Sequence, residues 1–196
     1  MSADESLGLM PSENPYVVEH GGFYRRWFSM ISDMAEFKSW VDQVKGTNEE
    51  TWVPLWKKAG TKFERLGDVE FDNKNYSKAK DYYLTAKIYF SIGRFPGNLS
   101  DVKHSISDDC IRAYSKANQF TDPPIKIIDI PHEGKKMRCH LRIPNGKGPF
   151  PAVLIMCGSD VFKEDRGWAG DFAINNSMAS LVMDAPGTGE NPVSGD

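Results

Sequence analysis

The stretch PAVLIMCGSD, residues 151–160, decides the fold of this chain. Its first seven residues form an unbroken apolar run, which is typical of a strand buried on both faces of a parallel sheet. Residues 161–175 have a helical pattern, and SLVMDAPG at 180–187 contains a second apolar strand. The order strand, loop, helix, strand predicts one βαβ unit and therefore an α/β fold.

An antiparallel hairpin is expected just before this unit. The segment TDPP, residues 121–124, ends the preceding helical region, since a residue before proline avoids helical geometry. A β-branched run over 125–130 and the tight-turn composition of HEGK at 132–135 predict the first strand and its turn. In the returning strand apolar and charged residues alternate. One face has Met137, Cys139, Leu141 and Ile143, and the other has Lys136, Arg138, His140 and Arg142.

The first half of the chain is predicted to be helical, because large apolar residues recur three or four positions apart. The predicted helices cover 23–44, 52–71, 76–90 and 101–118, and Asn48 or Thr51 could cap the second. Their aromatic side chains are Phe23, Tyr24, Trp27, Phe28, Trp52, Trp56, Tyr82, Tyr83 and Tyr89. Such side chains fit a helical cap that faces a flat aromatic substrate, but they fit a plain helical core at least as well, and the core is favoured.

Small residues in the second and third predicted helices allow a further interpretation. Leu66, Gly67, Ala79, Tyr83 and Ala86 have the spacing of one tetratricopeptide repeat, with small residues where paired helices touch. One repeat is too few for a stable solenoid, which needs about three. The pattern therefore indicates either a peptide-binding interaction module or two helices that simply pack closely.

The composition excludes several classes of protein. With 196 residues, 40% hydrophobic and 26% charged, the chain is expected to be globular, and its net charge of −3 does not favour a nucleic-acid surface. Its three cysteines are widely spaced and form no CxxC pair, which favours buried free thiols. The acidic N-terminus does not resemble a signal peptide, and no apolar run is long enough to span a bilayer. We expect a cytoplasmic location and no membrane partner.

The residues after the first apolar strand are the main candidates for chemistry. A glycine at position 158, at the carboxyl end of a strand, would let backbone N–H groups face a ligand, as in an oxyanion hole. Asp160 could be a polar site residue or the N-cap of a helix starting at Val161. Ser159 is not expected to be a nucleophile, because CGSDV is not the G-x-S-x-G motif. The charged segment FKEDRGW at 162–168 is expected to be a solvated helix face, and Trp168 either packs under it or lines a pocket.

Cofactor and metal sites are not expected. DAPGTGENP at 184–192 lacks the lysine of a P-loop, and Pro192 occupies the place of the third glycine of a dinucleotide fingerprint. The four histidines do not cluster, and no pair has metal-ligand spacing.

Taken in order, these motifs resemble a family. A helical segment with AGTKFERLGDVEFDNKNYSKAKDYYLTAKIYFSIGRFP at 59–96, a hairpin, PAVLIMCGSD and LVMDAPGTGEN at 181–191 are similar to two-domain α/β-hydrolases with an N-terminal helical cap. That group includes pseudooxynicotine hydrolase, the fermentation–respiration switch protein and the fungal heptaketide (yellowish-green pigment) hydrolases. The resemblance covers nearly the whole chain from about residue 23.

The resemblance implies an organisation and a site. It implies an N-terminal arm at 1–22, a helical cap domain at 23–120, and an incomplete α/β-hydrolase domain at 121–196. Gly158 and Ser159 match the oxyanion-hole turn, and Asp160 matches a position that is often acidic near the substrate. Trp168 is a weaker candidate for substrate contact. The glycines of PGTGE would shape the turn after the second strand.

The same resemblance implies an activity that this chain would not perform alone. The family's G-x-S-x-G nucleophile and its Asp and His partners are expected beyond Asp196, so we expect a fragment that is inactive by itself. The whole protein is expected to cleave a C–C bond of a β-diketone-like or aromatic polyketide substrate, as in pigment or melanin biosynthesis, without a cofactor. An ester hydrolase and a non-catalytic helical module are the alternatives, and the expected partners are the small-molecule substrate, the remainder of the hydrolase domain and a second copy in a homodimer.

Overall fold

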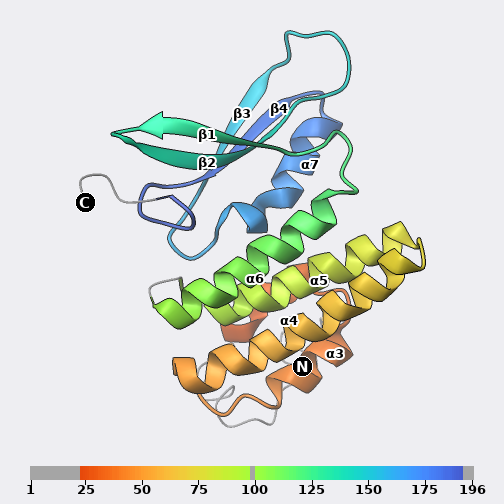
Figure 1. Ribbon diagram of the computed structural model, residues 1–196, viewed down its shortest axis with the longest axis vertical. Coiled ribbons are helices and arrows are strands. Elements are labelled where there is room, and N and C mark those ends of the chain that lie inside the picture. The colour runs from red at the N-terminus through yellow and green to blue at the C-terminus, as the bar shows by residue number, and fades with distance from the viewer. Residues whose placement is uncertain (1–22, 98–99, 192–196) are drawn as a thin grey trace, which may run out of the picture.

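The computed structural model describes residues 23–97 and 100–191, and the N-terminal arm expected at 1–22 lies outside the described residues. A helical layer comes first in the chain (Figure 1). It consists of the 3₁₀ helix η1 (Phe23–Met30) and the α-helices α3 (Met34–Val41), α4 (Glu49–Asp72), α5 (Tyr76–Arg94) and α6 (Asp101–Asn118). The helix predicted over 23–44 is therefore two shorter helices, whereas the one predicted over 101–118 has the predicted bounds.

Side-chain caps explain where several of these helices begin. The Asn48 side chain accepts a hydrogen bond from the Thr51 N–H at 3.1 Å, so Asn48 rather than Thr51 caps α4. Asp33 caps α3 in the same way, and its extended backbone interrupts the helical run that the apolar spacing alone suggests. Ser100 caps α6.

The helical core is aromatic, as the favoured interpretation of the sequence predicted. The Tyr89 ring is stacked between Trp56, at a centroid distance of 6.0 Å, and Phe63, at 5.2 Å. Trp52 lies edge-on to Trp56 and donates its indole N–H to the Ile92 carbonyl at 2.8 Å. These rings are buried, so they stabilise the layer through packing and burial of apolar area.

Two glycines of α4 allow it to approach α5 closely. The rings of Phe90 and Tyr83 occupy the space where side chains at Gly60 and Gly67, respectively, would stand. Ala79 and Ala86 of α5 are fully buried. The small residues of this helix pair therefore serve close packing, and they are not exposed to a peptide ligand.

The described part of the second half of the chain forms a four-stranded mixed sheet, with strand order β1-β2-β4-β3. The strands are β1 (Lys126–His132), β2 (Lys135–Arg142), β3 (Ala152–Cys157) and β4 (Ala179–Asp184). β1–β2 and β2–β4 are antiparallel, whereas β3 and β4 are parallel. Glu133 and Gly134 both have positive φ, 45° and 77°, which is the geometry of a two-residue type I′ turn. The predicted hairpin and the βαβ unit are both confirmed.

The connection from β3 to β4 runs through the 3₁₀ helix η2 (Lys163–Arg166) and α7 (Gly167–Asn175). In Figure 1 the sheet and α7 lie above the helical layer, with α6 on the side of that layer nearest the sheet. The prediction that β3 is buried on both faces is wrong for this structure. Within the described part of the chain β3 pairs with β4 only, and Leu154 and Met156 are 57% and 59% exposed.

In the described ranges, the elements from residue 23 to residue 118 are helices, and the first strand begins at residue 126. The domain limits placed at residues 22 and 120 stay predictions. None of the helices in the described ranges has the length and apolar character needed to cross a membrane.

Replacing Gly60 with alanine tests the close packing of α4 on α5. A Cβ at Gly60 would lie 2.5 Å from two carbons of the Phe90 ring, and that ring is fully buried. We expect Gly60→Ala to lower the free energy of unfolding by about 1–2 kcal/mol, because overpacking outweighs the gain in helix propensity. Urea unfolding followed by fluorescence measures it.

The matched control is Gly170→Ala in α7, where the nearest atom to the new methyl group is 3.5 Å away. Its stability should be unchanged or higher. A Gly60→Ala protein that is as stable as the control would contradict the packing described here.

Candidate functional site

A cavity of about 730 Å³ lies between the helical layer and the segment that follows β3. One side is formed by η1, α5 and α6, and the other by residues 160–161, η2 and α7. Its apolar lining includes Trp27, Leu84, Ile88, Phe95, Tyr114 and Trp168. A cavity of this size with apolar walls and a few polar groups has the properties of a small-molecule site.

Polar side chains at one side of the cavity converge on Asp165. Its carboxylate accepts hydrogen bonds from Ser91 Oγ at 2.7 Å, Lys87 Nζ at 3.2 Å and Arg94 Nη2 at 2.6 Å, all from α5. It also accepts the Phe162 N–H at 3.1 Å, which fixes the start of η2. One buried carboxylate therefore joins the helical layer to the βαβ unit.

The electrostatics of Asp165 follow from these contacts. Burial alone would raise the pKa of this carboxyl, but the charges of Arg94 and Lys87 and the bonds from Ser91 and the Phe162 N–H hold that pKa well below its usual range. Arg94 is 1% exposed, and its guanidinium lies 4.2 Å from the centroid of the Phe162 ring. The carboxylate therefore stays charged, as does the arginine that it compensates.

Lys163 is the centre of a second buried cluster. Its ammonium group contacts Asp184 at 2.9 Å, Glu164 at 2.9 Å and Glu190 at 2.6 Å. Burial lowers the pKa of Lys163, but these three carboxylates raise it above its usual value overall. Burial raises the pKa of Asp184, and the Lys163 charge offsets this only in part.

The expected solvated face at FKEDRGW is therefore wrong. Lys163, Glu164 and Asp165 are 1%, 2% and 8% exposed. Their partners lie on α5, about seventy residues earlier, and on β4 and the loop after it, so the local charge pattern could not reveal them.

The predicted oxyanion turn lies directly after β3. Gly158 and Ser159 are exposed, and a Cβ at Gly158 would meet no atom within 4 Å. The backbone at Gly158 is therefore exposed, but neither Gly158 nor Ser159 lines the cavity, whose lining in this segment begins at Asp160.

Asp160 lines the cavity, but it does not cap a helix. The N-cap of η2 is Phe162, and the Asp160 carboxylate instead accepts a hydrogen bond from Arg26 Nη2 of η1 at 2.8 Å. Trp168 also lines the cavity and is 63% exposed, so it does not pack beneath the charged segment.

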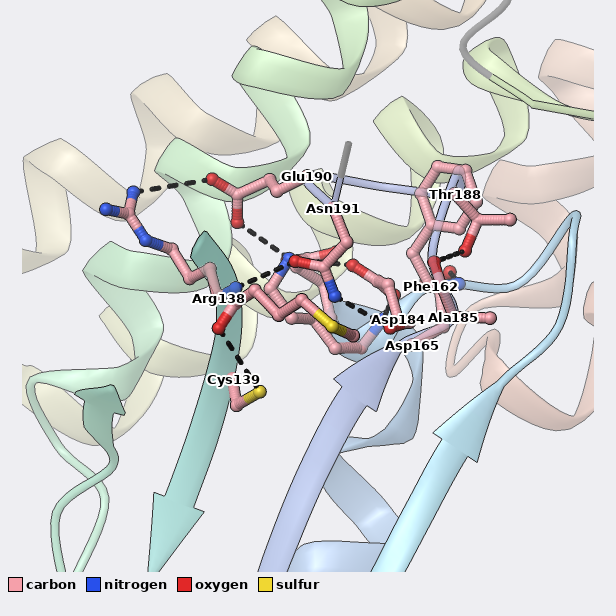
Figure 2. Close-up of polar contacts among 12 residues, drawn as sticks. Arg138, Cys139, Phe162, Asp165, Asp184, Ala185, Thr188, Glu190 and Asn191 are labelled. Carbon is pink, nitrogen blue, oxygen red and sulfur yellow. Dashed lines mark hydrogen bonds and ion pairs between the residues drawn. The ribbon is translucent and has the colours of Figure 1, made fainter. Parts of the chain in front are cut away.

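The glycine-rich loop after β4 is a structural turn in its described part. Gly187 and Gly189 have positive φ, 80° and 56°, and a side chain at Gly189 would collide with the Asp184 carboxylate. Figure 2 shows Asn191 between Arg138 and Asp184, where its amide accepts the Arg138 N–H at 2.8 Å and donates to the Asp184 carbonyl at 2.7 Å. The loop thus closes over the end of the strand.

Two residues of β2 that the alternation placed on a charged face are buried. His140 is 7% exposed and stacks on Tyr114 of α6 at a centroid distance of 5.6 Å, and Arg142 is 5% exposed. Arg142 pairs with Asp171 of α7 and donates to the Pro123 carbonyl at 3.2 Å. Both faces of β2 are covered here, because α6 and α7 pack over the predicted outer face.

The three cysteines are free and buried, as predicted. Burial raises the pKa of the Cys110 and Cys157 thiols to about 12, so neither is a reactive thiolate. Across residues 23–97 and 100–191, no three His, Cys, Asp or Glu side chains are grouped so that they could hold a metal ion.

Removing the charge of Asp165 tests its role between the layers. Asp165→Asn leaves Arg94 and Lys87 buried without their shared counter-charge, so we expect unfolding free energy to fall by about 3–5 kcal/mol. Urea denaturation provides the measurement. Asp42→Asn, which breaks an exposed pair with Lys38, is the control and should cost at most about 1 kcal/mol. Equal losses in the two variants would contradict the assigned role.

His140 predicts a pH dependence of stability. Burial lowers the pKa of this imidazole below its usual value, so between the folded and unfolded pKa values the unfolded chain binds more protons. The contribution of neutral His140 is complete above about pH 6.5 and is lost as the pH falls toward the folded pKa. His140→Phe keeps a ring against Tyr114, and its unfolding free energy should fall less between about pH 7.5 and 5.5 than that of the wild type. Parallel pH profiles would show that His140 does not titrate in this way.

Comparison with known proteins places this geometry in a family. The FrsA-like esterase model matches residues 28–192. The 2,6-dihydropseudooxynicotine hydrolase of Paenarthrobacter nicotinovorans is 23% identical over 164 residues, which cover 84% of this chain and 44% of that protein. Esterase FrsA of Vibrio parahaemolyticus is 28% identical over 157 residues, which cover 78% of this chain and 36% of that protein. The α/β hydrolase xenA of Xenoacremonium sinensis is 26% identical over 164 residues, which cover 80% of this chain and 39% of that protein.

Solved structures show the same fold. The crystal structure of the 2,6-dihydroxy-pseudo-oxynicotine hydrolase gives a TM-score of 0.66 at 22% identity, over 85% of this chain and 46% of that chain. The structure of AbyA5 wildtype gives a TM-score of 0.62 at 19% identity, over 92% of this chain and 44% of that chain. The chain spans less than half the length of these relatives. Because the family model covers most of the sequence and the structures agree in fold, the chain belongs to the FrsA-like esterase family of α/β-hydrolases.

Proposed function

We propose that this chain forms the helical cap and the first strands of a serine hydrolase that cleaves a C–C bond in a β-diketone-like or aromatic polyketide substrate. Shortening a polyketide in pigment or melanin biosynthesis is the role that we propose for such a reaction. The observation that carries the proposal is the cavity of about 730 Å³ beneath the helical layer, whose lining includes Asp160, three residues after the carboxyl end of β3. Ligands of α/β sheets bind outside the carboxyl ends of strands.

The chemistry of the cavity supports binding of an apolar carbonyl compound. Trp27, Phe95 and Trp168 offer aromatic surface to a flat substrate. Ser29 and Ser91 line the cavity, but within the described residues no histidine lines it to act as their base, and the Ser91 hydroxyl is held by Asp165. We therefore propose that the nucleophilic serine and its base come from sequence outside this chain.

In the proposed reaction the serine oxygen attacks a substrate carbonyl, and the resulting oxyanion is stabilised by the backbone N–H groups of Gly158 and Ser159. The base takes the proton of the serine hydroxyl during this attack. The C–C bond then breaks, its electron pair passes into an enolate, and the protonated base returns that proton to the enolate carbon to complete the ketone product. Water hydrolyses the acyl-enzyme that remains. Asp160 and Trp168 are proposed to lie beside the bound substrate.

The principal alternative is an ordinary ester hydrolase, in which an alkoxide leaves instead of an enolate. The name of the matched family favours it. The interaction-module alternative is not favoured, because Gly67 and Ala79 are buried within the helical layer. A cytoplasmic location, a homodimer, and action without cofactor, metal, nucleic acid or membrane complete the proposal.

The proposed oxyanion hole is tested at Ser159 in the hydrolase that carries this chain. Ser159→Pro deletes the backbone N–H, and we expect kcat to fall about 10²–10³-fold. Ser159→Ala keeps that N–H and should stay within a few-fold of the wild type, with circular dichroism to check that both variants fold. Similar rates in the two variants would remove the N–H from the mechanism, and absence of labelling by a serine-directed fluorophosphonate would remove the serine-hydrolase proposal itself.

The bond that is cleaved is tested with two aromatic probes. We expect 1-phenyl-1,3-butanedione to be hydrolysed to a ketone and a carboxylic acid, identified by chromatography, faster than phenyl acetate is hydrolysed to phenol. Turnover of the ester alone would contradict C–C cleavage and support the esterase alternative.

A further inference from the structure

We propose that Arg26 is a positioning residue for the segment between β3 and η2, holding its backbone in place through Asp160. This inference rests on the proposed function, because that segment contains the N–H groups assigned to the oxyanion. Arg26 belongs to η1 at the start of the helical layer, whereas Asp160 lies 134 positions later in the chain.

The segment 158–161 is anchored at both ends. Cys157 ends β3 in register with Asp184 of β4. At the other end, the Phe162 N–H is bound by Asp165 at 3.1 Å and the Lys163 N–H by Asp184 at 2.7 Å. Between these anchors, the side chain of Asp160 forms an ion pair with Arg26.

Arg26 is itself held in a defined orientation. Its guanidinium carbon lies 4.2 Å from the centroid of the Phe95 ring and 5.7 Å from that of Trp27. Those two rings meet edge to face at 5.6 Å. A planar guanidinium can stack on such rings and still donate to a carboxylate, which an ammonium group does less well.

The geometry connects the helical layer to the site. Arg26, Trp27, Phe95 and Asp160 all line the cavity, so a substrate that enters it passes beside the ion pair. Both charged side chains are about one third exposed, 36% and 37%, so the contact can open without the loss of a buried charge. A shift of η1 would therefore be transmitted to Gly158 and Ser159 through Asp160.

Amide hydrogen exchange of the purified 196-residue chain tests this without requiring any activity. In Arg26→Met, exchange in peptides that cover residues 158–163, which include the hydrogen-bonded Phe162 and Lys163 N–H groups, should rise roughly two- to fivefold, the factor expected for an exposed ion pair. Arg65→Met, the same substitution at an exposed arginine of α4, is the matched control and should leave these peptides unchanged. Arg26→Lys should restore part of the protection.

Salt provides a second measurement, made on the wild type and on Arg26→Met. Raising the salt concentration to about 1 M screens an exposed pair, so exchange in the peptides that cover 158–163 should rise in the wild type and much less in Arg26→Met. Unchanged exchange in Arg26→Met, or an increase spread equally over the whole chain, would overturn the proposal.

The catalytic consequence is measured in the hydrolase that carries this chain. Arg26→Met should lower kcat with KM changed less than about twofold, because positioning of oxyanion donors acts on the transition state. A change confined to KM would make Arg26 a substrate-binding residue and overturn the positioning role. Failure of the proposed function would instead appear as a wild-type protein without hydrolase activity, while the exchange result stands independently.

Discussion

The structure depends on one buried carboxylate that is shared by two layers. Asp165 lies in the βαβ unit, but three of its partners, Lys87, Ser91 and Arg94, lie on α5. Burial of charges is costly unless the partners are in place, and the fully buried Arg94 has its counter-charges on η2. Neither layer can therefore satisfy its own charges, and the two are stabilised only when they are docked together.

The cavity follows from this docking. α5 and η2 are fixed to one another by Asp165, while η1 and the segment after β3 meet through the Arg26–Asp160 pair. The space between these two contacts is lined by apolar side chains of both layers. The contact of Asp165 with α5 is buried, whereas the Arg26–Asp160 pair is partly exposed and borders the proposed oxyanion turn. The rigid part of the site is therefore separate from the adjustable part.

Much of the fold could be predicted because its signals are local. The spacing of apolar residues gave the helix at 101–118, and HEGK gave the hairpin turn, since both depend on neighbours within a few positions. The buried charges of 163–165 could not be predicted, because a charged run is normally solvated and their partners are distant in sequence. His140 and Arg142 were missed for the same reason: alternation shows that β2 has two faces, but not that α6 covers the second. For the site, the sequence indicated Asp160 and Trp168, which both line the cavity, but it gave no sign of Arg26.

The central claim is that the two layers unfold as one unit, and the three buried cysteines report on it directly. Cys110 lies in α6, whereas Cys139 and Cys157 lie in β2 and β3. Alkylation of each thiol at increasing urea concentration, resolved by peptide mass spectrometry, gives a separate unfolding midpoint for each layer. Coincident midpoints for all three cysteines are predicted. A midpoint for Cys110 well above those of Cys139 and Cys157 would show a helical layer that is stable without the sheet, and would contradict the account.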